Sequence, residues 1–327
     1  MSGFLIYSVY SRTFENPGSF KPFMIRRFGR LFPLLLFATI AYVVGLNLLV
    51  LAKSTAVDWG YARLFREPHL LEYLAPSAAE IVSTLSLTHG LGLFHKLILN
   101  YASWSISTEF YTYFLFAGVC LAFKGRRRLL AFALLAVVGF AVTAWASIEV
   151  HDCLNAGRCL DVSYDFGFAR CASAFFIGAL ACHAARRLTF SANGLQAVGL
   201  AALALVLVQV DEAPVLALLL PAVFALLIVS LSKDRGFLAE LFKRGPLQRL
   251  GERSYSIYLM HPVVLLPLVS YRGSIKGTAL TGAVLVAYLG VLWVVSGWTY
   301  RFVENPSRAL FNRIARRMAP PSPMGTA

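Results

Sequence analysis

Runs of seventeen or more apolar residues recur along this chain of 327 residues, and they restrict its fold more than any other feature. A helix of about 20 residues crosses the apolar core of a bilayer, which is roughly 30 Å thick. Hydrophobic residues make up 58% of the chain and charged residues only 14%, against about 25% charged residues in soluble domains. We therefore predict an all-α integral membrane protein, built as a multi-helix transmembrane bundle.

Eight of the apolar runs are long enough to be full spans. They cover residues 31–52, 104–123, 129–149, 166–184, 194–210, 213–232, 254–271 and 278–300. A ninth apolar stretch, 80–98, is interrupted by His89, His95 and Lys96, so we predict a re-entrant or interfacial segment there. The stretch Ser2–Tyr10 is too short to span and is predicted to be the end of a further helix.

Basic residues are distributed unevenly over the segments between the spans. With residues 11–30 placed in the cytoplasm, the cytoplasmic segments hold 22 Lys and Arg, and the outer segments hold 7. Membrane proteins carry such an excess on the cytoplasmic side, so the net charge of +14 is a topology signal. The basic residues are dispersed over many loops, which argues against nucleic-acid binding. We predict a membrane domain over residues 1–317 and a disordered, cytoplasmic C-terminal tail over residues 318–327.

Three arginines, Arg26, Arg27 and Arg30, lie at the cytoplasmic end of the first full span. Guanidinium groups bind phosphate through paired, charge-assisted hydrogen bonds, so this cluster is a candidate site for a phosphorylated ligand. The alternative is that these arginines are an ordinary basic flank of a span.

A carboxyl group lies about one turn inside the span that opens at Trp104. Ser105 and Glu109 are four residues apart and therefore share a helix face, while Trp104 suits an anchor at the membrane interface. An ionisable group at this depth must face protein or a water-filled cavity, so Glu109 is a candidate catalytic residue. A purely structural, hydrogen-bonded Glu109 is the alternative.

A histidine, His261, lies about 10 Å beyond the start of the apolar run that follows Arg253. Ser254, Tyr258 and His261 are spaced i, i+4, i+7 and are predicted to line one stripe of a helix. Imidazole at that depth is costly and points to a function, although it can also cap a backbone group or fill a gap in the packing.

The last span ends in the sequence Arg301-Phe302-Val303-Glu304-Asn305-Pro306. Arg301 and Glu304 are an i, i+3 pair suited to stabilising a helix end, and Asn305-Pro306 is expected to stop the helix.

Two cysteines, Cys153 and Cys159, share one outer loop, where an oxidising compartment would permit a disulfide. No spacing of Cys and His resembles a zinc site, so we expect no metal.

The order and spacing of these polar groups together resemble the membrane acyltransferase-3 family, of the O-acetyltransferase type. The matching stretches are Ser2–Ile6 (SGFLI), Arg26–Pro33 (RRxxRLxP), Trp104–Tyr111 (similar to WSxSxEFxF/Y), Leu250–His261 (LGxxSYSIYLxH) and Val303–Pro306 (VExP). The resemblance covers essentially the whole chain. It adds Tyr255 and Glu304 to the candidate site residues.

The resemblance implies a ten-helix protein of a bacterial inner membrane with both ends in the cytoplasm. It also implies transfer of an acyl group, usually acetyl from acetyl-CoA, to a hydroxyl of an extracytoplasmic glycan or lipid-linked sugar. The phosphates of the acyl-CoA would bind at the three arginines. A histidine such as His261 would act as the general base, and Glu109 would orient the acceptor or a catalytic histidine.

One part of the family pattern, a first helix with a histidine held to be essential, has no counterpart in this sequence. We therefore expect either a fragment of a longer protein or an inactive relative, and we expect the chain as written not to transfer acyl groups. The main rival function is a transporter or flippase, with Glu109, Arg170 and His261 as a relay. We find no inverted repeat that would support it.

The predicted topology can be tested by labelling with an impermeant thiol reagent on intact cells. A cysteine at Asn155 should be labelled and a cysteine at Gly125 should not, because the charge asymmetry places position 125 inside. Permeabilised cells, in which both positions should react, are the control. Labelling of position 125 alone from outside would contradict the topology.

Overall fold

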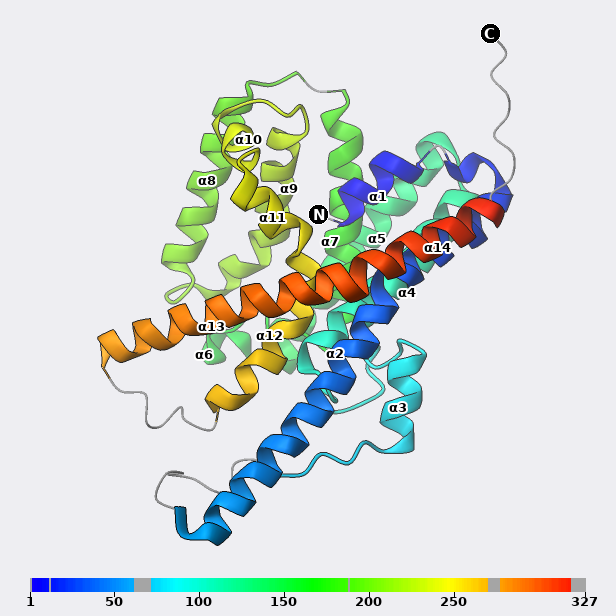
Figure 1. Ribbon diagram of the computed structural model, residues 1–327. Coiled ribbons are helices and arrows are strands. Elements are labelled where there is room, and N and C mark those ends of the chain that lie inside the picture. The colour runs from blue at the N-terminus through cyan, green and yellow to red at the C-terminus, as the bar shows by residue number, and fades with distance from the viewer. Residues whose placement is uncertain (1, 12, 62–71, 188, 270–276, 319–327) are drawn as a thin grey trace.

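The computed structural model describes residues 2–11, 13–61, 72–187, 189–269 and 277–318. All regular secondary structure in these ranges is helical, which confirms the all-α prediction (Figure 1). The helices of the bundle are α1 (Ser2–Tyr10), α2 (Phe20–Ala56), α4 (Trp104–Ala122), α5 (Gly125–Trp145), α7 (Gly167–Ala185), α8 (Ala192–Gln209), α9 (Leu220–Leu231), α12 (Ser254–Val269), α13 (Thr278–Thr299) and α14 (Asn305–Met318). Shorter helices are α3 (Ala78–Leu85), α6 (Cys153–Ala156), α10 (Phe237–Phe242) and α11 (Gly245–Glu252).

Six helices in the described part of the chain are long and apolar enough to cross a membrane. Each of the eight predicted spans coincides with a helix, but α4 and α12 are not among those six. The helix α12 is an apolar helix of only sixteen residues, and α4 carries Glu109 and several hydroxyl side chains. The protein is therefore a multi-pass membrane protein, and the count of eight spans stays a prediction. Most of the predicted tail, residues 319–327, lies outside the described residues.

Two helix ends differ from the sequence-based expectation. Helix α2 begins at Phe20 rather than at residue 31, because the segment Phe20–Arg30 continues the helix where it packs against α14. The prediction that Asn305-Pro306 stops the last helix is wrong. A π-helical turn, Tyr300–Glu304, leads directly into α14. Pro306 follows this π-helical turn closely, so the helix is already irregular where the proline removes a backbone donor.

The segment predicted to be re-entrant forms no spanning helix. Helix α3 has eight residues and begins at a capping box in which Ser77 and Glu80 satisfy each other's backbone N–H groups. Its length is about 12 Å, less than half of the apolar core of a bilayer. Turns and bends follow from Ser86 to Asn100. This irregular segment brings the chain to the start of α4.

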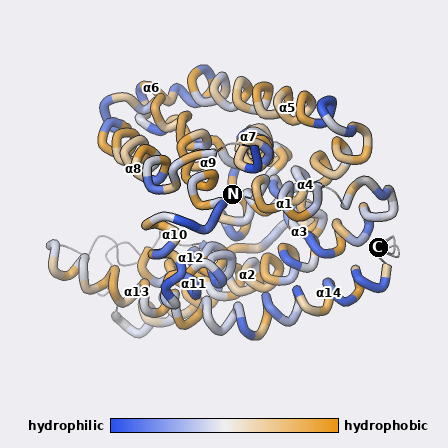
Figure 2. The backbone as a smooth tube through the Cα atoms, turned by 90° about the horizontal axis from the view of Figure 1, so that it is seen from above, coloured by the Kyte–Doolittle hydropathy of each residue, from blue (hydrophilic) through white to orange (hydrophobic). Residues whose placement is uncertain are grey.

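Helix α7 lies in the middle of one half of the bundle and packs against α1, α4, α5 and α9. In the other half, α2 packs against α12 and α14. Figure 2 shows these halves from above, with α5 and α8 along one side, α13 and α14 along the other, and α1 and α4 between them.

Glycines allow the backbones of neighbouring helices to contact the backbone of α7. A Cβ atom at Gly3 would lie 1.8 Å from the carbonyl oxygen of Phe175, and one at Gly139 would lie 2.8 Å from that of Ala169.

Aromatic rings fill the core between the two halves. The ring of Phe23 on α2 lies 5.0 Å from that of Phe14 and 6.0 Å from that of Tyr113. Phe116 on α4 lies 5.7 Å from Phe132 on α5. Centroid distances of this kind are typical of favourable ring pairs, and each ring buries a large apolar area. The rings hold α2, α4 and α5 together at the level of the arginine cluster.

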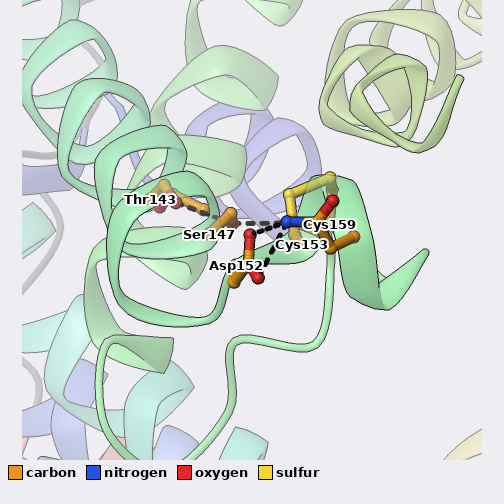
Figure 3. Close-up of a disulfide and its surroundings, with 6 residues drawn as sticks. Thr143, Ser147, Asp152, Cys153 and Cys159 are labelled. Atoms are coloured by element: carbon orange, nitrogen blue, oxygen red, sulfur yellow. Dashed lines mark hydrogen bonds between the residues drawn. A yellow bond between two sulfur atoms is a disulfide. The ribbon is translucent and has the colours of Figure 1, made fainter.

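The loop between α5 and α7 is closed by a disulfide between Cys153 and Cys159 (Figure 3). Ser147 Oγ lies 2.8 Å from the carbonyl oxygens of both Thr143 and Cys159, which share its one hydroxyl proton. The disulfide closes the loop, and the contact of Ser147 with the carbonyl oxygen of Cys159 holds that loop against the helical turn that follows α5. The sequence placed both cysteines in one outer loop, which allowed a disulfide between them but did not require it.

The contact between α2 and α14 gives a prediction about stability. A Cβ atom at Gly29 would lie 2.1 Å from the Cβ atom of Phe311, so Gly29→Ala should separate the two helices. Overpacking of this kind costs about 1–3 kcal/mol. The control is Gly118→Ala on α4, where nothing lies within 4 Å of the added Cβ atom. Thermal unfolding in detergent should show a lower midpoint for Gly29→Ala than for Gly118→Ala, and equal midpoints would contradict the packing.

Candidate functional site

Glu109 lies on α4, where hydroxyl groups satisfy its carboxylate. The hydroxyls of Ser2 on α1 and Tyr113 on α4 both donate hydrogen bonds to Glu109 Oε1, the second at 2.6 Å. Tyr113 is one turn further along α4 and almost fully buried. A carboxylate in an apolar bundle needs such donors, because desolvation without them is costly. Both donors occupy one oxygen, and no hydrogen bond within the described residues involves Oε2.

A cavity of about 260 Å³ adjoins this carboxylate, between α4, α7 and α1. Its lining includes Ser2, Trp104, Ser105, Glu109 and Arg170. The prediction that Ser105 and Glu109 share a helix face is therefore confirmed, and that face is turned into the cavity. A space of this size and polarity suits a small polar group presented by a ligand.

Arg170 brings a positive charge to the same cavity. Its Nη1 donates hydrogen bonds to the carbonyl oxygens of Leu160 and Val162, at 2.7 and 2.9 Å. Its guanidinium lies 5.6 Å from the ring of Trp104, within the range of a cation–π contact. Trp104, which the sequence predicted as an interface anchor, therefore contacts an arginine in the lining of the cavity.

The arginine cluster on α2 reaches Glu109 through one side chain. Arg27 donates a hydrogen bond to the hydroxyl of Tyr10 at 3.1 Å, and its guanidinium lies 5.7 Å from the ring centroid of Tyr113. Because Tyr113 also bonds Glu109, it joins the arginine cluster to the cavity. Arg26 is half-buried and Arg30 is exposed, and Arg30 lies within electrostatic range of both Tyr255 and Glu304.

Helix α12 supplies a second set of polar contacts. The Tyr255 hydroxyl donates to the carbonyl oxygen of Leu31 at 2.6 Å, which fixes α12 against α2. The Tyr258 hydroxyl lies 2.7 Å from Ser105 Oγ and donates to the Ala102 carbonyl oxygen at 2.9 Å. Tyr258 therefore connects α12 to the cavity-lining face of α4.

His261 follows Tyr258 on α12. Its Nδ1 lies 2.6 Å from the carbonyl oxygen of Tyr258. A carbonyl oxygen only accepts, so this bond requires the proton on Nδ1 and leaves Nε2 of the neutral ring as an acceptor. Ser254, the first residue of α12, is exposed, and no hydrogen bond of its side chain occurs among the described residues. All three residues of the predicted stripe therefore lie on α12 at the predicted spacing, and the rings of Tyr258 and His261 are 5.7 Å apart.

Glu304 lies at the end of the last span and is almost fully buried. The hydroxyl of Ser256 on α12 donates to its Oε2 at 2.7 Å. The predicted partner of Glu304, Arg301, lies instead over the ring of Phe302 at 5.4 Å. The bond to Ser256 joins α12 to the helix that continues into α14. Glu304 therefore links two helices and does not only stabilise the end of its own helix.

The structure brings some of the predicted site residues together and leaves others apart. Trp104, Ser105 and Glu109 line one cavity, whereas His261 does not line it and is linked to it only through Tyr258 and Ser105. No hydrogen bond between described residues joins Glu109 to His261. No group of three or more His, Cys, Asp or Glu side chains suited to a metal ion occurs within the described ranges.

The sequence reasoning missed three features of the polar interior. Tyr113 was not singled out, although it lies four residues after Glu109 and an i, i+4 spacing would have placed it on the same face. Arg170 was noted without its place at the cavity. A histidine–carboxylate pair, His151 Nε2 to Asp165 Oδ2 at 2.6 Å, joins residues fourteen positions apart across the disulfide loop, and no sequence signal would have found it.

These features define a helical membrane protein whose interior links a cluster of arginines to a cavity with a carboxylate. Residues 1–300 match the family model of acyltransferase-3, which is described as an acyltransferase domain. The chain therefore belongs to the acyltransferase-3 family and is a membrane acyltransferase, as its motifs indicated. No curated protein and no solved structure matches the chain.

The bond between Ser256 and Glu304 gives a prediction about stability. Ser256→Ala should leave a buried carboxylate without its donor, at a cost of about 1–3 kcal/mol. In a Glu304→Gln background, Ser256→Ala should cost less free energy of unfolding, because the glutamine amide carries no charge for the hydroxyl to stabilise. A double-mutant cycle on thermal unfolding in detergent measures the difference. Additive effects of the two substitutions would show that the contact is not formed.

Proposed function

We propose that the protein transfers an acyl group, acetyl in the simplest case, from cytoplasmic acyl-CoA to a hydroxyl of an extracytoplasmic glycan or lipid-linked sugar. Membership of an acyltransferase family supports the reaction class. The observation that carries the rest is Tyr113, which contacts Arg27 with its ring and Glu109 with its hydroxyl. A donor held at the arginines and an acceptor held at Glu109 would meet across this one side chain.

The donor fits the arginine end of this path. Acyl-CoA carries several phosphates on its nucleotide and its thioester on a long flexible arm. Arg26, Arg27 and Arg30 would bind the phosphates through charge-assisted hydrogen bonds. Arg27 is already oriented by Tyr10 and the surrounding rings, so less side-chain freedom would be lost on binding. The arm would then reach past Tyr113 toward the cavity.

The acceptor fits the cavity end. Oε2 of Glu109 is available to accept a hydrogen bond from a sugar hydroxyl, and Ser105 and Trp104 line the same space. In the transfer step the hydroxyl oxygen attacks the thioester carbonyl carbon, a base removes its proton, and the carbon–sulfur bond breaks to release the CoA thiolate, which takes up a proton. We assign His261 to the base role, because its Nε2 is left unprotonated by the bond at Nδ1. His261 lies outside the cavity, so the proton would reach it by way of the Ser105 and Tyr258 hydroxyls.

If His261 is the base, membranes that contain the protein should incorporate labelled acetyl groups from acetyl-CoA into glycan, and membranes without it should not. If the first-helix histidine of the family pattern is required instead, the chain as written should transfer none. Glu109→Gln and His261→Gln should each lower the rate without weakening acetyl-CoA binding, since both act on the acceptor step. General acid–base catalysis is worth about 100-fold or more. Movement of a glycan lipid across the membrane without acylation would favour a transporter, and donor binding without any transfer would favour an inactive relative.

The donor site is tested separately by acetyl-CoA binding to purified protein. Arg27→Ala should raise the dissociation constant roughly 10- to 100-fold, because a hydrogen bond to a charged group contributes about 1.5–3 kcal/mol. Arg126→Ala is the control, since Arg126 is an exposed arginine at the start of α5, outside the cluster. Equal binding by both variants would show that the α2 arginines mark topology only.

A further inference from the structure

Helix α14 is a basic helix with one face left uncovered by protein. Four of its fourteen residues are arginines, and none is Asp or Glu. Arg313, Arg316 and Arg317 are exposed, and the ion pairs of the described residues involve none of them. The positive charge on this helix is therefore not neutralised by an ion pair in the described part of the chain.

The opposite face of α14 is fixed on α2. The ring of Phe311 lies 5.7 Å from that of Phe28 and fills the space above Gly29. Ala315, four residues further on, is completely buried. Phe311 and Ala315 therefore mark the side of α14 that packs on α2, and the residues on the other side face away from the bundle.

The uncovered face carries an apolar stripe. Leu310, Ile314 and Met318 are 51%, 38% and 49% exposed, and their spacing of four residues places them on one side of the helix. Arg313 and Arg317 follow Leu310 and Ile314 by three residues, so they adjoin the stripe. A helix with an apolar stripe edged by arginines is typical of a helix that lies in a membrane interface.

The length of the helix places α14 at that interface. Helices α13 and α14 form one continuous helix of 41 residues, Thr278–Met318. At 1.5 Å per residue it is about 61 Å long, whereas a bilayer with its headgroup regions is about 40–45 Å thick. The apolar part is α13, so the basic part, α14, lies among or along the headgroups.

We propose that the uncovered face of α14 is a binding site for anionic phospholipids. Arg313, Arg316 and Arg317 bind the headgroup phosphates, and the stripe of Leu310, Ile314 and Met318 packs on the upper part of the acyl chains. The occupant is anionic because this face offers three cations and no acidic side chain. The site does not depend on the acyltransfer reaction proposed above.

The test measures binding of short-chain phosphatidylglycerol and phosphatidylcholine to the full chain, purified in a neutral detergent. The wild type should bind phosphatidylglycerol more tightly than phosphatidylcholine. A triple variant, Arg313→Gln with Arg316→Gln and Arg317→Gln, should lose about 100-fold in affinity for phosphatidylglycerol, since each basic residue near an anionic surface is worth a factor of about five.

The control is the double variant Arg126→Gln with Arg127→Gln, which removes two exposed arginines from the start of α5 and should leave the affinity unchanged. Equal binding of the two lipids, wild-type affinity in the triple variant, or an equal loss in the control would overturn the proposal. Salt gives a second measurement that needs no variant. Raising ionic strength from about 0.1 M to 1 M shortens the screening length from about 10 Å to 3 Å, so salt-insensitive binding would also overturn it.

Discussion

The interior of this bundle is organised by the need to supply hydrogen-bond donors to carboxylates among apolar helices. Glu109 receives two hydroxyl donors, and Glu304 receives one from Ser256. Each bond crosses from one segment to another or fixes a neighbouring aromatic ring, so satisfying the charge also positions the helices. Because an unsatisfied carboxylate is costly in an apolar surrounding, these bonds restrict how α1, α4 and α12 can be placed.

The need for hydrogen-bond partners also explains why Glu109 and His261, both predicted site residues, lie apart. The ring of Tyr113 lies beside Arg27 and its hydroxyl beside Glu109, which makes a continuous path from the arginines to the cavity. His261 is satisfied differently, by the carbonyl oxygen one turn before it on its own helix. It therefore needs no partner on another helix, and its connection to the cavity runs through Tyr258 and Ser105.

The sequence predicted the helical membrane fold because apolar runs long enough to span leave few alternatives. It also predicted the shared face of Ser105 and Glu109, since four residues separate them on one helix. It did not predict Ser256 as the partner of Glu304, because those residues are 48 positions apart and meet only through the packing of α12 on the last span. The continuation of the helix through Pro306 was missed because a π-helical turn changes the phase of the helix just before it.

The glycine contacts of α7 have a consequence for motion within the protein. At Gly3 and Gly139 the backbone packs directly on the backbone of α7, with no side chain between them. No side chain there can change its rotamer, so α1 and α5 cannot move relative to α7 by side-chain rearrangement at these contacts. Helix α4 meets α7 through large side chains instead, such as the ring pair of Tyr113 and Phe175 at 5.9 Å. The cavity therefore has one rigid wall, formed by α1 and α7, and one adjustable wall, formed by α4. A ligand too large for the resting space would enter by moving the wall that carries Glu109.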